Sequence, residues 1–312
     1  MKIGIVGLGL IGGSFAKAIK KNTNCTVFGF DINEATFSKA LLISAIDGKL
    51  TDENIGECDF VLVSLYPIAT MKYIKENADS FKNGAIVVDC CGVKGNICRS
   101  LKEIADKAKF TFIGGHPMAG REFSGFEYSD EYLFDGASMI LTPYGYVDIN
   151  IDIGKGNMLI DDPMEIPIDN PIDTHADKSI DKMIEKLKKF FLLLGFDSVV
   201  ITTPDDHDRM IAYTSQLAHV VSSAYVKSSS ALRNKGFSAG SFKDLTRVAR
   251  LNEEMWTELF FENKNNLIVE VDDIINNLKK YSFALKNNDK DMLRELLKEG
   301  REIKESLEKV RK

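Results

Sequence analysis

The sequence lacks long apolar runs, an excess of positive charge and any regular cysteine pattern. No apolar stretch approaches the ~18 residues of a membrane span, and the glycine-rich start at residues 1–7 is unlike a signal peptide. The five cysteines are odd in number and lack metal-ligand spacing, so we expect free thiols in a reducing cytoplasm and no metal site. With 40 Lys and Arg against 46 Asp and Glu, the net charge of −6 argues against nucleic acid or an anionic membrane as partner.

The first half of the chain alternates short apolar runs with helical periodicity. This alternation is typical of an α/β domain with a parallel sheet covered on both faces. The runs that we expect to be strands are residues 3–6, 26–30, 60–64, 85–88, 110–113 and 138–142. The sequence therefore predicts a Rossmann-type doubly wound domain over residues 1–147.

Residues 148–177 interrupt this pattern. The segment holds eight acidic residues, one lysine and three of the seven prolines, which disfavours both helix and burial. We interpret it as an exposed acidic insertion or linker. From 178 to 312 the sequence predicts an all-helical dimerisation domain apart from a short strand-like run at 198–202. Thr203 and Pro204 are typical of the start of a helix, which we expect to run to about residue 232. The apolar stripes of this domain suit either an internal bundle or a dimer interface.

Residues 7–12 form a G-x-G-x-x-G motif directly after the first strand and at the start of a helix. In such a loop Gly7 permits the tight turn, Gly9 lets the backbone approach a pyrophosphate, and Gly12 lets helix and strand pack closely. The helix that Leu10 and Ile11 open then directs its amides and dipole at the phosphates. This context predicts a dinucleotide-binding site.

Asp31 ends the second expected strand, nineteen residues after Gly12. A carboxylate there accepts hydrogen bonds from ribose hydroxyls and repels a 2′-phosphate, and neither Ile32 nor Asn33 offers a cation for that phosphate. The predicted cofactor is therefore NAD rather than NADP. Ser64, at the end of a neighbouring strand, is expected to line the same site.

His116 follows a predicted strand within a glycine-rich stretch, which places it at the carboxyl edge of the sheet. The nicotinamide and substrate lie at that edge in this architecture. A neutral imidazole there can take a proton from an alcohol while hydride leaves for NAD. His116 is therefore the candidate catalytic base.

Several motifs together closely resemble prephenate dehydrogenases. They are G-L-G-L-I-G-G-S at 7–14, G-H-P-M-A-G-R-E-F-S-G at 115–125, D-L-T-R-V-A at 244–249 and M-W at 255–256. The resemblance implies a Rossmann-type domain joined to a helical dimerisation domain, and hence a homodimer. It also implies oxidative decarboxylation of prephenate to 4-hydroxyphenylpyruvate in tyrosine biosynthesis, although some related enzymes prefer arogenate.

The same resemblance assigns roles to individual residues. His116 matches the family's histidine that hydrogen-bonds the ring hydroxyl, and Arg247 matches the arginine that binds a substrate carboxylate. An ion pair with Asp244, three residues earlier, is the alternative for Arg247, and Asp244 itself is a candidate for the substrate site. Gln216 and His219 occupy a family H-x-x-H element and either contact substrate or form a buried polar network.

The sequence departs from the family pattern at two positions, Gln216, which replaces the first histidine of the H-x-x-H element, and Gly92. Many members carry a serine where Gly92 stands, and its hydroxyl helps to hold the reacting alcohol; a backbone amide, a water or Cys91 is the expected substitute. Lys94 is either an electrostatic contact to the substrate or a solvated lysine at a helix start. These departures keep two alternatives open, an arogenate dehydrogenase and an NAD-binding sensor without activity. His207 is expected to pair with the flanking carboxylates.

Overall fold

The computed structural model describes residues 1–143, 178–237 and 239–310. Contacts between Cα atoms divide the chain into two compact units. The first comprises Met1–Val147 and Asp177–Leu267, and the second comprises Asp148–Ala176 and Ile268–Lys312. The acidic insertion expected at 148–177 lies outside the described residues.

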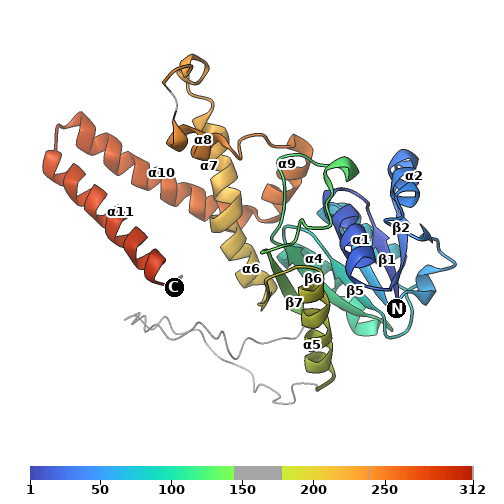
Figure 1. Ribbon diagram of the computed structural model, residues 1–312. Coiled ribbons are helices and arrows are strands. Elements are labelled where there is room, and N and C mark those ends of the chain that lie inside the picture. Colours follow the sequence, from blue (N-terminus) through green and yellow to red (C-terminus); the bar gives the residue numbers. More distant parts are fainter. Residues whose placement is uncertain (144–177, 238, 311–312) are drawn as a thin grey trace, which may run out of the picture. The chain divides into compact units, whose positions relative to one another are not determined.

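An eight-stranded sheet forms the centre of the first unit, in the order β3-β2-β1-β4-β5-β6-β7-β8 (Figure 1). Every neighbouring pair is parallel except β6 and β7, which are antiparallel. The strands are β1 (Lys2–Val6), β2 (Thr26–Phe30), β3 (Gly48–Lys49), β4 (Phe60–Val63), β5 (Ile86–Asp89), β6 (Thr111–Pro117), β7 (Ser138–Pro143) and β8 (Ser198–Ile201). The first six follow the doubly wound order of a Rossmann-type domain, which confirms the predicted α/β class.

Helices cover both faces of this sheet because successive side chains of each strand point to opposite faces. Leu62 and Val88 enter one core with α1 and α5, whereas Val61 and Val87 enter a second core with α3 and α4. The helices of this unit are α1 (Leu10–Asn22), α2 (Glu34–Leu42), α3 (Pro67–Glu76), α4 (Gly95–Lys107), α5 (Lys178–Leu193), α6 (Pro204–Ile211), α7 (Leu217–Tyr225), α8 (Gly240–Thr246) and α9 (Glu253–Glu262). Short helical turns are η1 (Ile55–Glu57), η2 (Phe126–Tyr128), the π-helical η3 (Ala212–Gln216) and η4 (Ala231–Arg233).

The sheet extends past residue 178, and the strand-like run predicted at 198–202 is confirmed as β8. Strand β8 pairs with β7, and α5 buries Phe191 beside Phe15 in the first core. Phe196, in the turn that leads to β8, packs on the same ring. These aromatic contacts hold α5 and β8 on the sheet, so the described part of 178–312 is not all-helical.

The helix predicted to begin after Thr203 does so, and the Thr203 hydroxyl accepts from the Asp206 amide at 3.2 Å. It was expected to continue to about residue 232, but it passes through η3 and α7 ends at Tyr225. Three consecutive serines at 228–230 follow, and the Ser228 hydroxyl accepts from the Ser230 amide. Such local bonds favour turns over helix, which explains the earlier end.

The described part of the second unit consists of α11 (Lys290–Val310) and all but the start of α10 (Lys264–Lys286). Asn288 adopts a positive φ of 52° in the turn between them, and Asp289 caps α11 by accepting from the Met292 amide at 2.9 Å. Tyr281 bonds the Leu296 carbonyl across the pair at 3.3 Å. Several large apolar side chains remain exposed on these helices, namely Ile275, Leu278, Phe283, Leu285, Leu297, Ile303 and Leu307.

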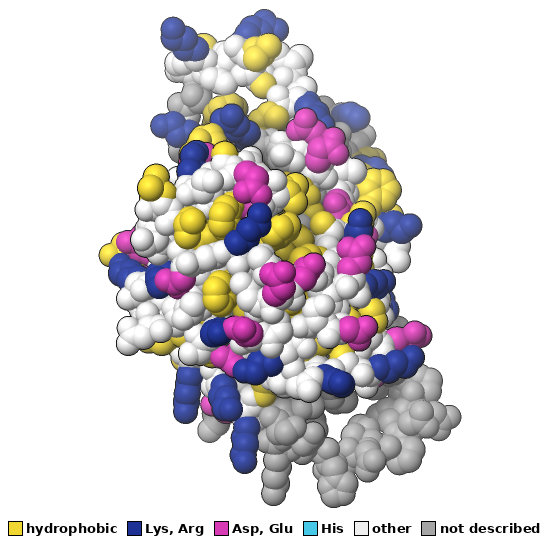
Figure 2. All heavy atoms as spheres, turned by 90° about the vertical axis from the view of Figure 1, so that its right-hand side faces the viewer, with side chains coloured by type: hydrophobic (Ala, Val, Ile, Leu, Met, Phe, Trp, Pro, Cys, Tyr) yellow, Lys and Arg dark blue, Asp and Glu magenta, His cyan; other side chains and the backbone are white. Residues whose placement is uncertain are grey.

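The surface fits the charge balance of the sequence. On the face drawn in Figure 2, Lys and Arg side chains are interspersed with Asp and Glu around apolar ones. None of the helices in the described ranges is long and apolar enough to cross a membrane.

Candidate active site at the end of the parallel strands

The glycine loop between β1 and α1 is shaped by close backbone contacts. Gly7 has a φ of +85°, and a Cβ on it would lie 2.5 Å from the Ser64 carbonyl oxygen. A Cβ on Gly12 would overlap the Gly7 carbonyl oxygen. By contrast, no atom lies within 4 Å of the Cβ position of Gly9. The loop is therefore packed where it meets the fold and open where a ligand can approach the backbone.

The groups around this loop fit a dinucleotide. No side chain caps the start of α1, so the amides of Leu10 and Ile11 keep the free donors of a helix N-terminus. The Asp31 carboxylate accepts from the Leu8 and Asn33 amides, both at 2.8 Å, which fixes it at the end of β2. Among the residues that the structure describes, the buried Ser64 hydroxyl has no hydrogen-bond partner within normal distance, and the weakly polar Cys90 thiol lies beside it.

His116 lies near the end of β6, as predicted, and is half-buried. Two glycines precede it because there is no room for side chains: a Cβ on Gly114 would overlap the Thr142 hydroxyl, and one on Gly115 would lie 2.5 Å from the Asp89 carbonyl oxygen. Strand β6 is thereby held tightly between β5 and β7. This packing fixes the backbone that carries the imidazole.

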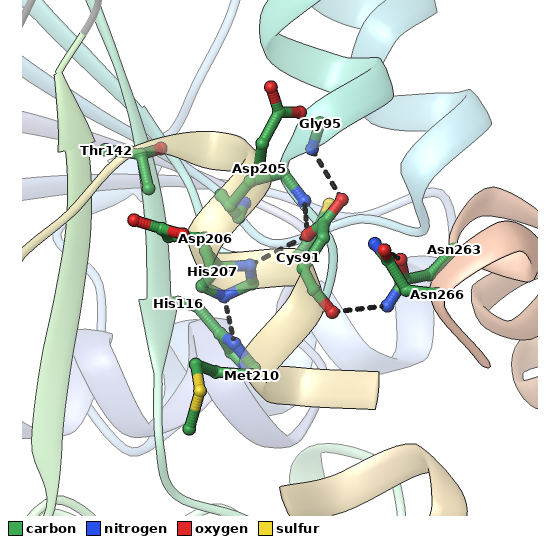
Figure 3. Close-up of polar contacts among 12 residues, drawn as sticks. Cys91, Gly95, His116, Thr142, Asp205, Asp206, His207, Met210, Asn263 and Asn266 are labelled. Carbon is green, nitrogen blue, oxygen red and sulfur yellow. Dashed lines mark hydrogen bonds and ion pairs between the residues drawn. The ribbon is translucent and has the colours of Figure 1, made fainter. Parts of the chain in front are cut away.

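His116 is part of a hydrogen-bonded chain with two residues of α6 (Figure 3). Its Nδ1 lies 2.9 Å from His207 Nε2, and His207 Nδ1 lies 2.8 Å from Asp208 Oδ1. Burial, the neighbouring His207 and the Lys94 charge hold the pKa of His116 well below its usual value. Burial also lowers the pKa of His207, although Asp208 opposes the shift. Both imidazoles are therefore neutral at pH 7.

Asp208 is held by backbone groups from elsewhere in the unit. The Lys94 and Gly95 amides at the start of α4 each donate to its carboxylate at 2.7 Å. The Asn263 side chain donates to the Asp208 carbonyl oxygen at 2.7 Å. The carboxylate thus lies on the N-terminus of α4, where negative charge is stabilised.

Lys94 does not have the role that the sequence suggested. Its side chain is fully buried and its Nζ forms an ion pair with the equally buried Asp89. Burial alone would lower its pKa, but the Asp89 carboxylate outweighs that effect and raises it. Asp89 also accepts from the Cys91 amide at 3.0 Å and the Gly115 amide at 3.2 Å. Lys94 therefore neutralises a structural carboxylate, and the expected contact with substrate is corrected.

Gly92 lies beside the Nε2 atom of His116. A Cβ on Gly92 would lie 3.8 Å from His116 Nε2 and 3.5 Å from a Leu259 methyl, both ordinary contacts. The Cys91 thiol cannot replace the missing serine, because it bonds the Leu65 carbonyl and Thr70 hydroxyl, each at 3.3 Å. Burial raises the pKa of that thiol well above its usual value. Cys91 is a structural group.

Gln216 and His219, the two residues of the H-x-x-H element, have different surroundings. Gln216 is buried; its amide donates to the Leu259 carbonyl at 3.1 Å and accepts from Asn263 at 2.9 Å. It belongs to the buried polar network, and its expected place in the substrate site is corrected. His219 instead stacks on Trp256, with ring centroids 3.9 Å apart. Burial and the nearby Arg247 charge lower the pKa of His219.

Arg247 and Asp244 are both exposed on and after α8. The alternative ion pair between them is not formed, and Arg247 has no carboxylate partner within the described ranges. Arg250 lies over the Phe123 ring at 5.0 Å from its centroid, which brings this segment beside the loop that follows His116. A guanidinium free of protein carboxylates is available to an anionic ligand.

Sequence reasoning assigned no functional role to His207 and missed its contact with His116. Its pairing with Asp208 is confirmed, but its second nitrogen reaches His116, 91 positions away in the chain. The missing signal is topological. In the sheet, β8 lies next to β7 and so two strands from β6. The helix that follows β8, α6, therefore brings His207 to His116 on β6.

Comparisons with known proteins agree with this arrangement. The family models described as "Prephenate dehydrogenase, nucleotide-binding domain" and "Prephenate dehydrogenase, dimerization domain" match residues 15–152 and 203–299. Prephenate dehydrogenase of Bacillus subtilis is 26% identical, over 97% of this chain and 75% of that protein. Cyclohexadienyl dehydrogenase of Zymomonas mobilis is 27% identical, over 98% of this chain and 95% of that protein.

A solved structure with a similar fold is prephenate dehydrogenase from Aquifex aeolicus in complex with hydroxyphenyl propionate and NAD+. It has a TM-score of 0.76 and 27% sequence identity, covering 98% of both chains. Arogenate dehydrogenase from Synechocystis, at 23% identity and a TM-score of 0.73 over 98% of this chain and 100% of that one, shares the fold.

The buried pair of Lys94 and Asp89 makes a prediction about stability. Lys94→Met should lower the free energy of unfolding by about 3–5 kcal/mol, because the Asp89 carboxylate would stay buried without a counter-charge. Lys82→Met is the matched control: its pair with Asp59 leaves the two side chains 44% and 38% exposed, so its loss should cost at most about 1 kcal/mol. Urea unfolding measures both. Equally small losses would contradict the structural role of Lys94.

Proposed function

Because the chain belongs to the prephenate dehydrogenase family, we propose that it oxidatively decarboxylates prephenate to 4-hydroxyphenylpyruvate with NAD as hydride acceptor. The observation that carries this proposal is the position of His116. Its Nε2 lies 3.8 Å from the position that a Cβ on Gly92 would take and makes no hydrogen bond with the residues that the structure describes. A neutral imidazole with one free nitrogen suits a proton acceptor.

The reaction requires little covalent chemistry from the protein. His116 Nε2 accepts the proton of the ring hydroxyl as hydride leaves the same carbon, and the carbon–oxygen bond becomes a carbonyl. The bond to the ring carboxylate then breaks, CO₂ departs, and its electron pair makes the ring an aromatic phenolate. The proton held on His116 Nε2 returns to the oxygen and gives the phenol. The residues of the site must therefore hold the substrate in the correct orientation to the cofactor and accept one proton.

NAD, when bound, supplies the hydride acceptor. We assign its pyrophosphate to the Gly7–Gly12 loop and the amides of Leu10 and Ile11, and its adenosine ribose to Asp31. Ser64, whose buried hydroxyl lacks a good partner, completes the site. No ion pair within the described residues places a cation on Asp31, which supports NAD over NADP.

Arg247 is our candidate for a substrate carboxylate, with the His219 imidazole beside it. Prephenate carries two carboxylates and no ammonium group, so an arginine free of protein carboxylates suits it. Arogenate would add an ammonium, for which the exposed Asp244 is the nearby carboxylate in sequence. Whether the protein prefers prephenate or arogenate therefore tests the roles proposed for Arg247 and Asp244.

We also propose a homodimer. The second family match is a dimerization domain, and the helices of the second unit expose large apolar side chains, such as Leu278, Phe283 and Leu297. Exposed apolar side chains at helical spacing are typical of an interface.

The decisive assay is NADH formation with prephenate and with arogenate, using NAD and NADP. We expect turnover of prephenate with NAD, and a fall of about 10²–10⁴-fold in kcat for His116→Asn, because the proton acceptor is lost. NAD affinity of that variant should be unchanged. Unchanged turnover would remove His116 from the mechanism, and activity with arogenate alone would reassign the substrate. NAD binding without turnover of either would favour a sensor.

The open Gly9 position predicts a separation of binding from stability. Gly9→Ala should leave the melting temperature unchanged, because nothing lies within 4 Å of the new methyl, yet weaken NAD binding about tenfold or more by blocking close approach. Gly300→Ala, equally open in α11, is the control and should leave the Kd unchanged. Fluorescence titration checks this, and an unaltered Kd for Gly9→Ala would place the pyrophosphate elsewhere.

The contacts around Gly92 predict that a serine at this position increases activity. Gly92→Ser should fit without strain and let a hydroxyl bond the reacting alcohol, raising kcat/KM about fivefold for one neutral hydrogen bond. Gly92→Ala adds the same Cβ without the hydroxyl and should not show the gain. Steady-state kinetics compare the three proteins. Equal values for the serine and alanine variants would show that the hydroxyl has no role there.

A further inference from the structure

The chain of His116, His207 and Asp208 has a direction that the contacts determine. Asp208 is its fixed end, because an ionised carboxylate can only accept hydrogen bonds. Its Oδ1 accepts from the Lys94 amide and its Oδ2 from the Gly95 amide, both at 2.7 Å. The contact of 2.8 Å to His207 Nδ1 is therefore a third bond that Asp208 accepts, and His207 Nδ1 carries the proton.

The remaining proton positions in this hydrogen-bonded chain follow because each neutral imidazole carries one proton on its ring nitrogens. With its proton on Nδ1, His207 presents a lone pair at Nε2. His116 Nδ1, 2.9 Å away, must then donate to it and carry the proton of His116. The remaining nitrogen, His116 Nε2, is left with a lone pair, 3.8 Å from the position that a Cβ on Gly92 would take.

We propose that Asp208 and His207 are positioning residues that fix His116 in the tautomer whose Nε2 accepts a proton. The catalytic meaning of this inference rests on the proposed function, whereas the tautomer itself does not. Without the chain, His116 could equally place its proton on Nε2 and would then donate to the alcohol oxygen. It could not act as a base in that form.

The same chain stabilises the charge that forms during the reaction. When Nε2 takes the alcohol proton, the His116 imidazolium still donates from Nδ1 to His207, and His207 donates to Asp208. Of the other charged groups near His116, the Lys94 ammonium opposes the new charge, but Asp89 neutralises it in an ion pair. Asp208 is therefore the carboxylate that stabilises the new positive charge on His116, through the intervening His207 ring.

Nitrogen-15 NMR of histidine-labelled protein tests the tautomer directly, without substrate or NAD. The chain holds four histidines. We expect His116 to show a protonated Nδ1 and an unprotonated Nε2. His219, whose Nδ1 donates to the Ser215 carbonyl at 2.8 Å, is an internal control with the same expected tautomer in every variant. A proton on His116 Nε2 in the unmodified protein would overturn the proposal.

Asp208→Ala should release the hydrogen-bonded chain. With no carboxylate to accept from His207 Nδ1, the His207 proton can occupy either ring nitrogen, and His116 loses its fixed tautomer. We expect this change in the spectrum and a fall of about 10²–10⁴-fold in kcat, with the Kd for NAD unchanged. An unchanged His116 tautomer in the folded variant would contradict the proposal.

A second pair of variants covers the possibility that Asp208→Ala does not fold, since it also removes the contacts with the Lys94 and Gly95 amides at the start of α4. His207→Phe keeps a ring but no acceptor, and should leave His116 without a fixed tautomer. His207→Gln restores an acceptor for His116 Nδ1 and should recover the original tautomer and part of the lost kcat. Identical spectra and rates for the two would reduce His207 to a packing role. A correct tautomer in a protein that oxidises neither substrate would refute only the proposed function.

Discussion

The site depends on the buried carboxylate of Asp89 at the end of β5. It accepts hydrogen bonds from Lys94 and from the Cys91 and Gly115 amides, so it joins β5, the turn before α4 and β6. A buried charge costs several kcal/mol unless it is paired, and the pairing fixes where each donor must lie. Gly92 and the N-terminus of α4 are placed by this turn, and His116 directly follows one of the donors. The geometry of the candidate active site is therefore a consequence of one structural ion pair.

The parts of the site that sequence could predict are those set by local geometry. A positive φ at Gly7 and the close contact at Gly12 follow from a tight strand–helix turn, and both carry a recognisable spacing. Asp31 and His116 each follow a short apolar run, so a strand prediction places them at the same edge. These inferences need only the alternation of strand and helix segments along the sequence and the rule that parallel strands end at the same edge of the sheet.

The parts that sequence could not predict are set by burial and by distant partners. Lys94 and Gln216 have the polarity of ligand-binding residues, and only the packing around them reveals that Asp89, Leu259 and Asn263 already use their hydrogen bonds. His207 offers two nitrogens, and the sequence around it accounts for one. Its second partner lies on β6, on the far side of β7 from the strand that precedes α6.

The pairing of β7 with β8 has a consequence for the order in which the protein is made. Phe15 and Phe134 leave the ribosome early, but Phe191 and Phe196, which pack against them, are translated only after the acidic segment. The glycine loop and His116 therefore exist in the nascent chain before the core beneath one face of their sheet is complete. Until β8 emerges, that face is an apolar surface within reach of chaperones and of other nascent chains.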